Sequence, residues 1–298
     1  MDISIVVSTR DRADRIADAF PHYFRLRSGL AWEVLFVNNG STDHTAAVLA
    51  RFAESLPQRV RVIDEPKPGV SAGRNAGLRS ATGAVIAFMD DDCYPAEDFL
   101  DRLWECFLEP GLDYLGGRIL LYDKKDYPIT IKTCLEREDI PPRSFLRAGV
   151  VHGANMAFRR NVLLNIGDFD ERLGPGAVVY GEELDLLARA SAAGFRGAYD
   201  PRPVVFHHHR RSSREDVRRL MAIYDMGRGA YYAKAVTDPR MRRAFLWPVI
   251  RRIMGNVRRL DFGVMWREFH GAWKYLSLPE RKEQDKAGRL TGNRNTES

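Results

Sequence analysis

The sequence predicts an α/β protein with a mostly parallel central sheet flanked by helices and a helical extension at its C-terminus. Short apolar runs rich in β-branched residues alternate with amphipathic segments through roughly the first 210 residues. Strands that alternate with helices pair in parallel through right-handed crossovers. Beyond residue 212 the pattern is helical and rich in arginine.

The predicted elements follow from the points at which the apolar periodicity changes. Strands are expected at residues 3–8, 32–37, 59–63, 84–89, 114–122 and 202–207. Helices are expected at residues 12–24, 43–52, 70–80, 96–107 and 181–193, over most of 212–277, and after 152–160. The charged, proline-containing segment 123–147 is expected to be an irregular, mobile loop.

Length and composition fit one large domain, residues 1–210, followed by a basic extension, residues 211–298. Hydrophobic residues make up 45% of the 298 residues and charged residues 29%, which suits a globular core rather than disorder. Residues 207–298 carry 21 Lys and Arg against 10 Asp and Glu, whereas the rest of the chain is slightly acidic. A basic segment can meet nucleic acid, anionic lipid or a phosphorylated substrate, and composition alone leaves all three open.

The N-terminus and the cysteines predict a cytoplasmic location. No basic segment precedes an apolar run at the start of the chain, so we expect no signal peptide. No apolar run reaches the roughly 18 residues that a membrane-spanning helix needs. Cys93, Cys106 and Cys134 are odd in number and widely spaced, so free thiols in a reducing cytosol are expected.

Three polar clusters stand where predicted parallel strands end, at residues 8–10, 38–43 and 90–92. Ligands of open α/β sheets bind beyond the carboxyl ends of the strands. These clusters are therefore expected to converge on one edge of the sheet, although they lie far apart in the sequence.

The cluster Asp90-Asp91-Asp92 follows six apolar residues and predicts a divalent cation. Three adjacent carboxylates repel one another, so the arrangement is costly unless a cation is bound. Mg²⁺ or Mn²⁺ takes oxygen ligands, often one or two carboxylates plus substrate phosphates. In an extended segment Asp90 and Asp92 would share one side and Asp91 would point elsewhere. The alternative is a solvated acidic turn.

A glycine-rich segment, residues 68–77, precedes these acids. Its glycines allow close backbone approach, and Arg74 is a candidate partner for a phosphate or a base. The segment lacks the Gly-Lys-Ser/Thr ending of a P-loop and the G-x-G-x-x-G spacing of dinucleotide sites. Taken alone it is a weak signal.

Taken together, the motifs resemble glycosyltransferase family 2. VNNGSTDHT, PGVSAGRNAGL, FMDDDCYP, GANMAFRR and GEELDL follow the first strand in the order and spacing of that family, across roughly residues 2–210. The resemblance implies a GT-A fold, which is Rossmann-like. It also implies transfer of a sugar, of hexosyl type, from a nucleotide diphosphate donor, usually with inversion and with Mn²⁺ or Mg²⁺ as cofactor.

The resemblance also implies roles for single residues around the donor. Thr9 and Arg10 would line the nucleotide pocket. Asn38 stands where the family usually has an aspartate that contacts the base, and it can still accept a hydrogen bond from a pyrimidine N–H. Asp92 would be the direct metal ligand, and Asp90 would contact the ribose or the water shell of the metal. Asp91 is also a candidate donor-binding residue, and the case for it is weaker than the case for Asp90 or Asp92.

Glu183 is the candidate general base, because the second acid of GEELDL holds that role in the family. Helical spacing places Glu183 on the apolar face and Asp185 on the outer face, paired with Arg189. Burial would raise the pKa of a carboxyl group toward the working range of a base. Glu182 is the other candidate for the base. Alternatively, both acids are only N-terminal helix charges that the helix dipole stabilises.

The resemblance also implies a third metal ligand, because the family often has a histidine ligand at the end of the last strand. Alternation places His207 and His209 on one face and His208 on the other, and His207 is favoured as closest to the strand. A basic loop that pairs with phosphate or solvent is the alternative. Asn155 would contact donor or acceptor, or only start a helix.

The basic extension places large apolar groups beside arginines, as in interfacial helices. The acceptor could then be lipid-linked, with the protein peripheral on the inner face of the membrane. The alternative is that these helices pack on the first domain and expose their arginines. Nucleic acid is not expected as a partner, because no helix-turn-helix or zinc spacing is present.

The sequence therefore predicts a metal-dependent inverting glycosyltransferase. It would move a sugar from a nucleotide-diphosphate donor, a UDP-sugar, to a hydroxyl of a glycan or lipid-linked acceptor. The alternative is a non-catalytic protein of the same fold that binds nucleotide sugars or a membrane surface. A sugar-nucleotide pyrophosphorylase would need a glycine after the first strand, and residues 8–12 have none.

Overall fold

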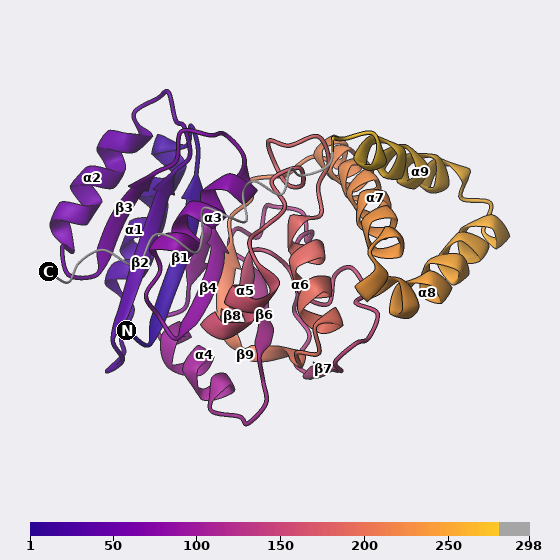
Figure 1. Cartoon of the computed structure of the whole chain (residues 1–298). Helices are drawn as coiled ribbons and strands as arrows, with labels where there is room; N and C mark the ends of the chain where they lie inside the picture. The colour runs from indigo at the N-terminus through magenta and orange to yellow at the C-terminus, as the bar shows by residue number, and fades with distance from the viewer. Residues whose placement is uncertain (280–298) are drawn as a thin grey trace, which may run out of the picture.

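The computed structural model describes residues 1–279, which form a nine-stranded sheet between helices and a helical C-terminal region (Figure 1). The strands are β1 (Ile3–Thr9), β2 (Trp32–Asn38), β3 (Val60–Asp64), β4 (Val85–Asp90), β5 (Cys93–Pro95), β6 (Tyr114–Leu121), β7 (Glu138–Ile140), β8 (Asn155–Arg159) and β9 (Gly197–His207). The helices are α1 (Ala13–Phe24), α2 (Thr45–Ser55), α3 (Val70–Ser80), α4 (Phe99–Phe107), α5 (Arg160–Ile166), α6 (Glu182–Ala192), α7 (Arg214–Thr237), α8 (Pro239–Arg258) and α9 (Phe262–Leu276).

The sheet is parallel in its N-terminal half and mixed beyond it. Its order is β3-β2-β1-β4-β8-β6-β9-β5, with β7 paired to β9. The pairs among β1 to β4 are parallel, as predicted from the strand–helix alternation. Beyond β4 only β6 and β9 pair in parallel, and β8 lies antiparallel to both neighbours. The sequence did not indicate this reversal.

Alternation along the strands explains why both faces of the sheet are covered. In β1, Ile3, Ile5 and Val7 join one apolar cluster, and Val6 joins the cluster on the opposite face. All four side chains are fully buried. Continuous apolar runs of this kind belong to strands that are covered by helices on both sides.

Several predicted elements differ from the structure near the site. The helix expected after residues 152–160 is present as α5, which starts at Arg160, but the strand β8 inside that segment was not predicted. The strand expected at 202–207 begins earlier, at Gly197. A short strand that was not predicted, β5, lies between β4 and α4. Segment 123–147 is irregular except for β7, and it is anchored where Tyr127 and Thr130 contact His209 and His207.

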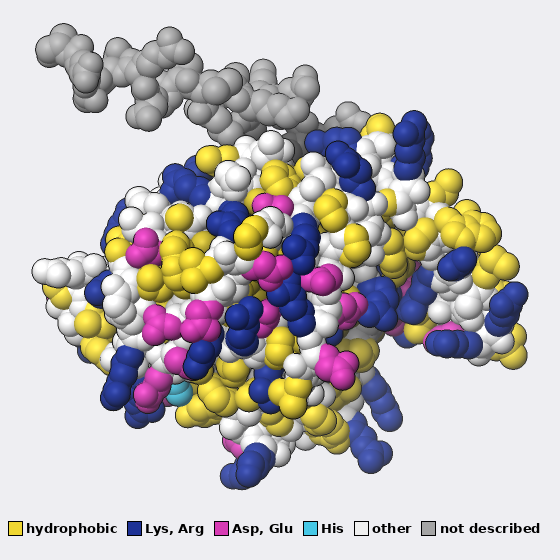
Figure 2. Space-filling view, turned by 90° about the horizontal axis from the view of Figure 1, so that it is seen from below, with side chains coloured by type: hydrophobic (Ala, Val, Ile, Leu, Met, Phe, Trp, Pro, Cys, Tyr) yellow, Lys and Arg dark blue, Asp and Glu magenta, His cyan; other side chains and the backbone are white. Residues whose placement is uncertain are grey.

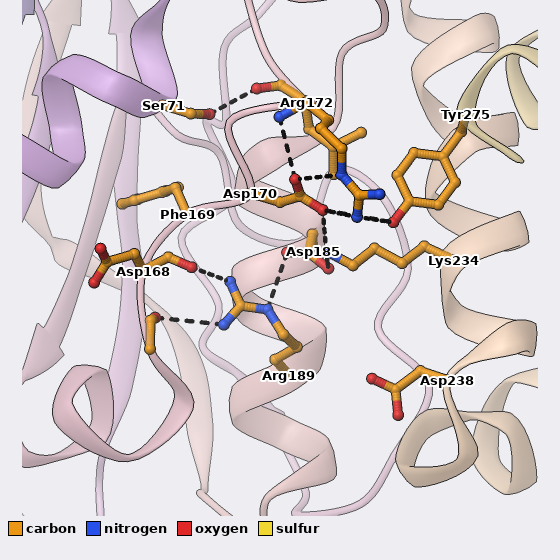
Figure 3. A network of polar contacts seen from close by, with 12 residues as sticks. Ser71, Asp168, Phe169, Asp170, Arg172, Asp185, Arg189, Lys234, Asp238 and Tyr275 are labelled. Atoms are coloured by element: carbon orange, nitrogen blue, oxygen red, sulfur yellow. Dashed lines mark hydrogen bonds and ion pairs between the residues drawn. The ribbon is translucent and has the colours of Figure 1, made fainter. Parts of the chain in front are cut away.

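The helical extension packs on α6 through buried charges as well as apolar groups (Figure 3). Lys234 of α7 lies 2.7 Å from both Asp170 and Asp185. The predicted pair of Asp185 with Arg189 is present at 3.0 Å. The prediction that Asp185 faces outward is wrong, because α7 covers it and leaves its side chain 1% exposed. Tyr275 of α9 completes the network near Asp170.

No helix among residues 1–279 combines the length and the apolar character needed to cross a bilayer.

Replacing Lys234 by methionine should strongly destabilise the fold. The change keeps most of the side-chain volume but leaves Asp170 and Asp185 buried with one cation fewer, which costs on the order of 3 kcal/mol. Urea unfolding followed by circular dichroism measures the free energy of unfolding. Lys124→Met, at an exposed position, is the control and should change that free energy by less than about 0.5 kcal/mol. Equal stability of both variants would contradict a structural role for the network.

Candidate active site

The strand ends that were predicted to converge do so in the register of the sheet. Thr9 of β1 lies opposite Asn38 of β2, and Ser8 lies opposite Asp90 of β4. Beyond the turn, Asp43 accepts hydrogen bonds from the first amides of two helices, Thr45 of α2 and Ala13 of α1. Asp43 therefore stabilises helix starts rather than facing a ligand.

A cavity of about 560 Å³ opens at this edge of the sheet. The sequence-predicted site residues line it, except Asn38 and Asn155: Thr9, Arg10, Arg74, Asp90, Asp91, Asp92, Glu182, Glu183 and His207. Helix α7 contributes Tyr224, and the segment before that helix contributes Arg211. The extension is thus part of the wall of the cavity.

The three acids of the triplet face different partners. Asp90 ends β4 and pairs with Arg74 at 2.8 Å. The chain then turns, and Asp91 and Asp92 both pair with Arg12, at 2.7 and 3.2 Å. The expectation that Asp90 and Asp92 share one side is wrong, because it assumed an extended segment where the structure has a turn.

Asp92 and His207 form the centre of a potential metal site. Nε2 of His207 lies 3.2 Å from Oδ1 of Asp92. Nδ1 lies 3.2 Å from the carbonyl oxygen of Thr130 and 3.1 Å from the hydroxyl oxygen of the same residue, so either tautomer of the ring finds a partner. With a hydrogen on Nε2 the ring donates to the carboxylate, and with Nε2 bare the nitrogen and Oδ1 present lone pairs that suit a metal ion.

The donor atoms around this contact fit a divalent ion. Ligand atoms of Asp92, Cys93 and His207 all lie within 4.8 Å of one another. Carboxylate oxygen and imidazole nitrogen suit Mn²⁺. Burial and the charge of Asp92 raise the pKa of the Cys93 thiol well above its usual value, so Cys93 stays protonated and is the weakest donor of the three.

The pKa values of the paired acids differ because their partners differ. Burial would raise the pKa of Asp92, but the hydrogen bond from His207 and the charges of His207 and Arg12 hold it below its usual range. Burial raises the pKa of Asp91, and the charge of Asp92 adds to that rise while Arg12 opposes it. Asp92 is therefore the acid best suited to remain a charged ligand.

Arg74 is buried between two acids. Its side chain is 3% exposed, and it donates to Asp90 at 2.8 Å and to Glu182 at 2.9 Å. It also donates to the carbonyl oxygen of Gly153 at 3.3 Å. The guanidinium thus joins the end of β4 to the start of α6, and most of its donors are used within the protein.

Glu183 faces the cavity and forms no ion pair with a basic side chain among residues 1–279. Its neighbour Glu182 occupies Arg74, whereas Glu183 lines the opening beside Gly153. Burial raises the pKa of Glu183 to about 8, and the charge of Glu182 adds to the rise. A carboxyl group with such a pKa can accept a proton near neutral pH.

Several buried side-chain polar atoms have no hydrogen-bond partner among residues 1–279, and Oγ1 of Thr9 and Oδ1 of Asn38 are two of them. They lie on neighbouring strand ends, and the amide of Asn38 is oriented by a 2.9 Å hydrogen bond to Asp64. Thr9 lines the cavity, so its hydroxyl is placed to meet a ligand there, whereas Asn38 is not among the lining residues. Asn155, by contrast, donates to the backbone of Arg118 and Pro203, so it positions strands.

Sequence reasoning missed Arg12, Arg211, Tyr224 and His152, which all line the cavity. Arg12 stands three residues beyond β1, a position that could have signalled it. Arg211 likewise stands a few residues beyond the end of a strand, β9, after His207, His208 and His209. Nothing local to α7 indicated Tyr224, because its contribution depends on how that helix packs.

The stability of the protein should depend on pH through Glu183. Its pKa of about 8 in the fold exceeds the usual 4.5, so its contribution is complete below pH 4.5 and is lost as the pH rises through 8. Glu183→Gln removes this titration. The melting temperature of the variant, relative to wild type, should therefore rise across that range and level off above it. Glu54→Gln, on the exposed side of α2, should keep the wild-type pH dependence. A constant difference for Glu183→Gln would contradict the raised pKa.

Known proteins resemble this chain mainly in its first 170 residues or so. Residues 4–167 match Glycosyl transferase family 2. Glycosyltransferase AglE of Haloferax volcanii is 29% identical over 169 residues, which cover 55% of this chain and 52% of that protein. Pre-mycofactocin glycosyltransferase of Mycobacterium tuberculosis is 28% identical over 167 residues, 54% of this chain and 34% of that protein. The chain thus spans about half or less of these two relatives.

Solved structures share the fold over a longer stretch. A mannosyltransferase from Pyrobaculum calidifontis, in complex with GDP-Man and Mn²⁺, aligns with a TM-score of 0.63 and 16% identity over 96% of this chain and 78% of that one. TarS 1-349 of S. aureus, in complex with UDP-GlcNAc, aligns with a TM-score of 0.61 and 16% identity over 80% and 68%. With more than half of its length matched, and with this fold, the chain belongs to glycosyl transferase family 2 and has a GT-A architecture.

Proposed function

We propose that this protein is a metal-dependent inverting glycosyltransferase that moves a sugar from a UDP-sugar to a hydroxyl group of a glycan or lipid-linked acceptor. The observation that carries the proposal is the pairing of two features in one cavity. Asp92 and His207 bring a carboxylate oxygen and an imidazole nitrogen within 3.2 Å of each other, and Glu183 carries a pKa suited to a base.

The donor nucleotide would occupy the ends of β1 and β2. Asn38 is not among the cavity-lining residues, so the base would have to reach past the lining to the end of β2. There the unpaired Oδ1 of Asn38 can accept a hydrogen bond, which suits uracil because its N3 carries a hydrogen, whereas cytosine has none there. The unpaired Oγ1 of Thr9 lies on the next strand. Solved structures of the same fold are bound to GDP-Man and to UDP-GlcNAc, which supports a nucleotide-sugar donor. Because their bases differ, the choice of uracil rests on the residues of this site.

Asp92 and His207 would hold the divalent ion, with Asp90 facing the ribose or the water shell of that ion. Bound there, the ion would neutralise the leaving diphosphate. Arg12 sits against Asp91 and Asp92, and Arg211 lines the same cavity. Both guanidinium groups carry charge that complements a diphosphate.

Glu183 would act as the general base. It would take the proton from the acceptor hydroxyl while that oxygen attacks the anomeric carbon of the sugar. Attack opposite the diphosphate gives inversion in a single displacement. Arg74 supports this role indirectly, because it binds Glu182 and leaves Glu183 as the uncompensated acid.

Glu183→Gln tests the base. The amide keeps the shape of the side chain but cannot accept the proton, so kcat should fall by about 10²-fold to 10⁴-fold. The dissociation constant of the donor should stay within about threefold, because the donor does not depend on that proton. Turnover is measured with a panel of UDP-sugars and calorimetry measures donor binding. Glu182→Gln is the matched comparison: if it abolishes turnover while Glu183→Gln does not, the roles are reversed.

Asp92→Asn tests the metal site. Calorimetry of UDP binding with and without Mn²⁺ should show that the ion strengthens binding to the wild-type protein. The variant should lose that gain, since a neutral amide is a poor ligand for the ion. Asp98→Asn, an exposed acid at the start of α4, should behave as wild type. Binding without turnover in the wild type would favour the non-catalytic alternative.

A further inference from the structure

Helix α9 turns its apolar face toward the outside of the protein and its acidic residue toward the inside. Its large apolar side chains point outward: Phe262, Trp266, Phe269, Trp273 and Leu276 are each 57% exposed or more. Their spacing of four, three, four and three residues places them on one face. The glutamate of this helix, Glu268, is buried. A helix packed on a soluble core shows the opposite pattern.

This orientation of α9 is enforced by close packing on α7. A Cβ at Gly229 would lie 1.8 Å from the carbonyl oxygen of Glu268, and a Cβ at Gly271 would lie 1.9 Å from that of Met226. Only glycine allows the two backbones to approach so closely. Glu268 then reaches Arg228 at 2.6 Å and Asn256 of α8 at 3.2 Å. The aromatic side chains are thus held outward by the fold.

Helix α8, which contacts α9, also exposes large apolar side chains. They are Leu246, Trp247, Ile250, Ile253, Met254 and Val257. We name these six, the five outward side chains of α9 and Leu260 between the helices the α8–α9 apolar face. Exposure of so many large apolar groups on two neighbouring helices marks an interaction surface.

The charges around this face are almost all positive. Between residues 239 and 276 the only acids are Asp261 and the buried Glu268. Arg251, Arg258 and Arg259 are exposed and pair with no acid among residues 1–279. Figure 2 shows hydrophobic side chains lying among Lys and Arg side chains at this end of the molecule. The partner of the face should therefore be both apolar and anionic.

We propose that the α8–α9 apolar face docks on a membrane surface that contains anionic lipids. Tryptophan and phenylalanine partition at the boundary between headgroups and acyl chains, and arginines bind the lipid phosphates. Neither helix is apolar enough to span the bilayer, so both lie in the plane of the interface.

The charge pattern argues against two other occupants. A second copy of this chain would bring the unpaired arginines of both faces together, and like charges repel. Residues 280–298 contain one leucine and no aromatic residue, so they offer little apolar area to cover the face.

Docking stands independently of the proposed function, and it favours one class of acceptor. Helix α7 lines the cavity and packs against both α8 and α9. The cavity therefore lies one helix away from the proposed membrane surface. If the proposed function holds, a lipid-linked hydroxyl is the acceptor class that this placement favours.

Vesicle flotation tests the apolar part of the face. The full chain is mixed with phosphatidylcholine vesicles, with or without about one-third phosphatidylglycerol. The wild-type protein should float with the anionic vesicles, and its tryptophan emission should shift to the blue. Trp266→Ser with Phe269→Ser should weaken partitioning by more than about tenfold. The matched control, Leu108→Ser with Leu164→Ser, removes two exposed leucines elsewhere and should bind as wild type.

Charge reversal tests the electrostatic part. Arg258→Glu with Arg259→Glu should weaken binding to anionic vesicles by about 30-fold or more, since each cation near such a surface contributes about a factor of five. Arg51→Glu, an exposed change on α2, should have little effect. Raised salt should weaken wild-type binding.

Two outcomes would overturn the proposal. One is no binding of the wild-type protein to anionic vesicles at low salt. The other is a lipid-free dimer, seen by sedimentation velocity, that Trp266→Ser with Phe269→Ser dissolves, because the face would then be a contact between copies. Both readouts are independent of turnover, so loss of activity in Glu183→Gln and loss of docking in the arginine variants remain distinguishable.

Discussion

The candidate site depends on one buried guanidinium. Arg74 comes from α3, yet it binds the last residue of β4 and the first residue of α6. A buried cation is costly unless it is paired, so its two acids must stay in place. Because Glu182 is one of them, its neighbour Glu183 is fixed at the cavity wall and has no cation of its own. Burial raises the pKa of Glu183, and the charge of the neighbouring Glu182 adds to the rise.

The rest of the site repeats the same principle with other charges. Arg12 holds Asp91 and Asp92, and His207 approaches Asp92 from the end of β9. Each acid of the triplet therefore has a different electrostatic environment. The acid with the lowered pKa lies beside the histidine whose second nitrogen is oriented by Thr130. A bound cation would take its ligands from this carboxylate and this imidazole.

The C-terminal extension links this chemistry to the surface of the molecule. Helix α7 supplies Tyr224 to the cavity and Lys234 to the buried acids behind α6. The same helix packs so closely on α9 that only glycine fits between them. One helix thus stabilises α6, which carries Glu182 and Glu183, and holds the aromatic side chains of α9 outward. The separation into a first domain and an appendage, which composition suggests, does not describe the cavity.

The sequence by itself determined the parallel strands, the polar clusters at their carboxyl ends and the family. Local patterns carry these features, because apolar alternation and turn residues act over a few positions. It also placed Thr9, the acid triplet, Glu183 and His207 among the candidates, and all of them line one cavity. Only the tertiary structure decided which charge pairs with which. Arg74 could have met a phosphate, and Asp185 could have faced water. Arg74 is instead paired with Asp90 and Glu182, and Asp185 is covered by Lys234 of α7, through contacts far apart in the chain that no local pattern records.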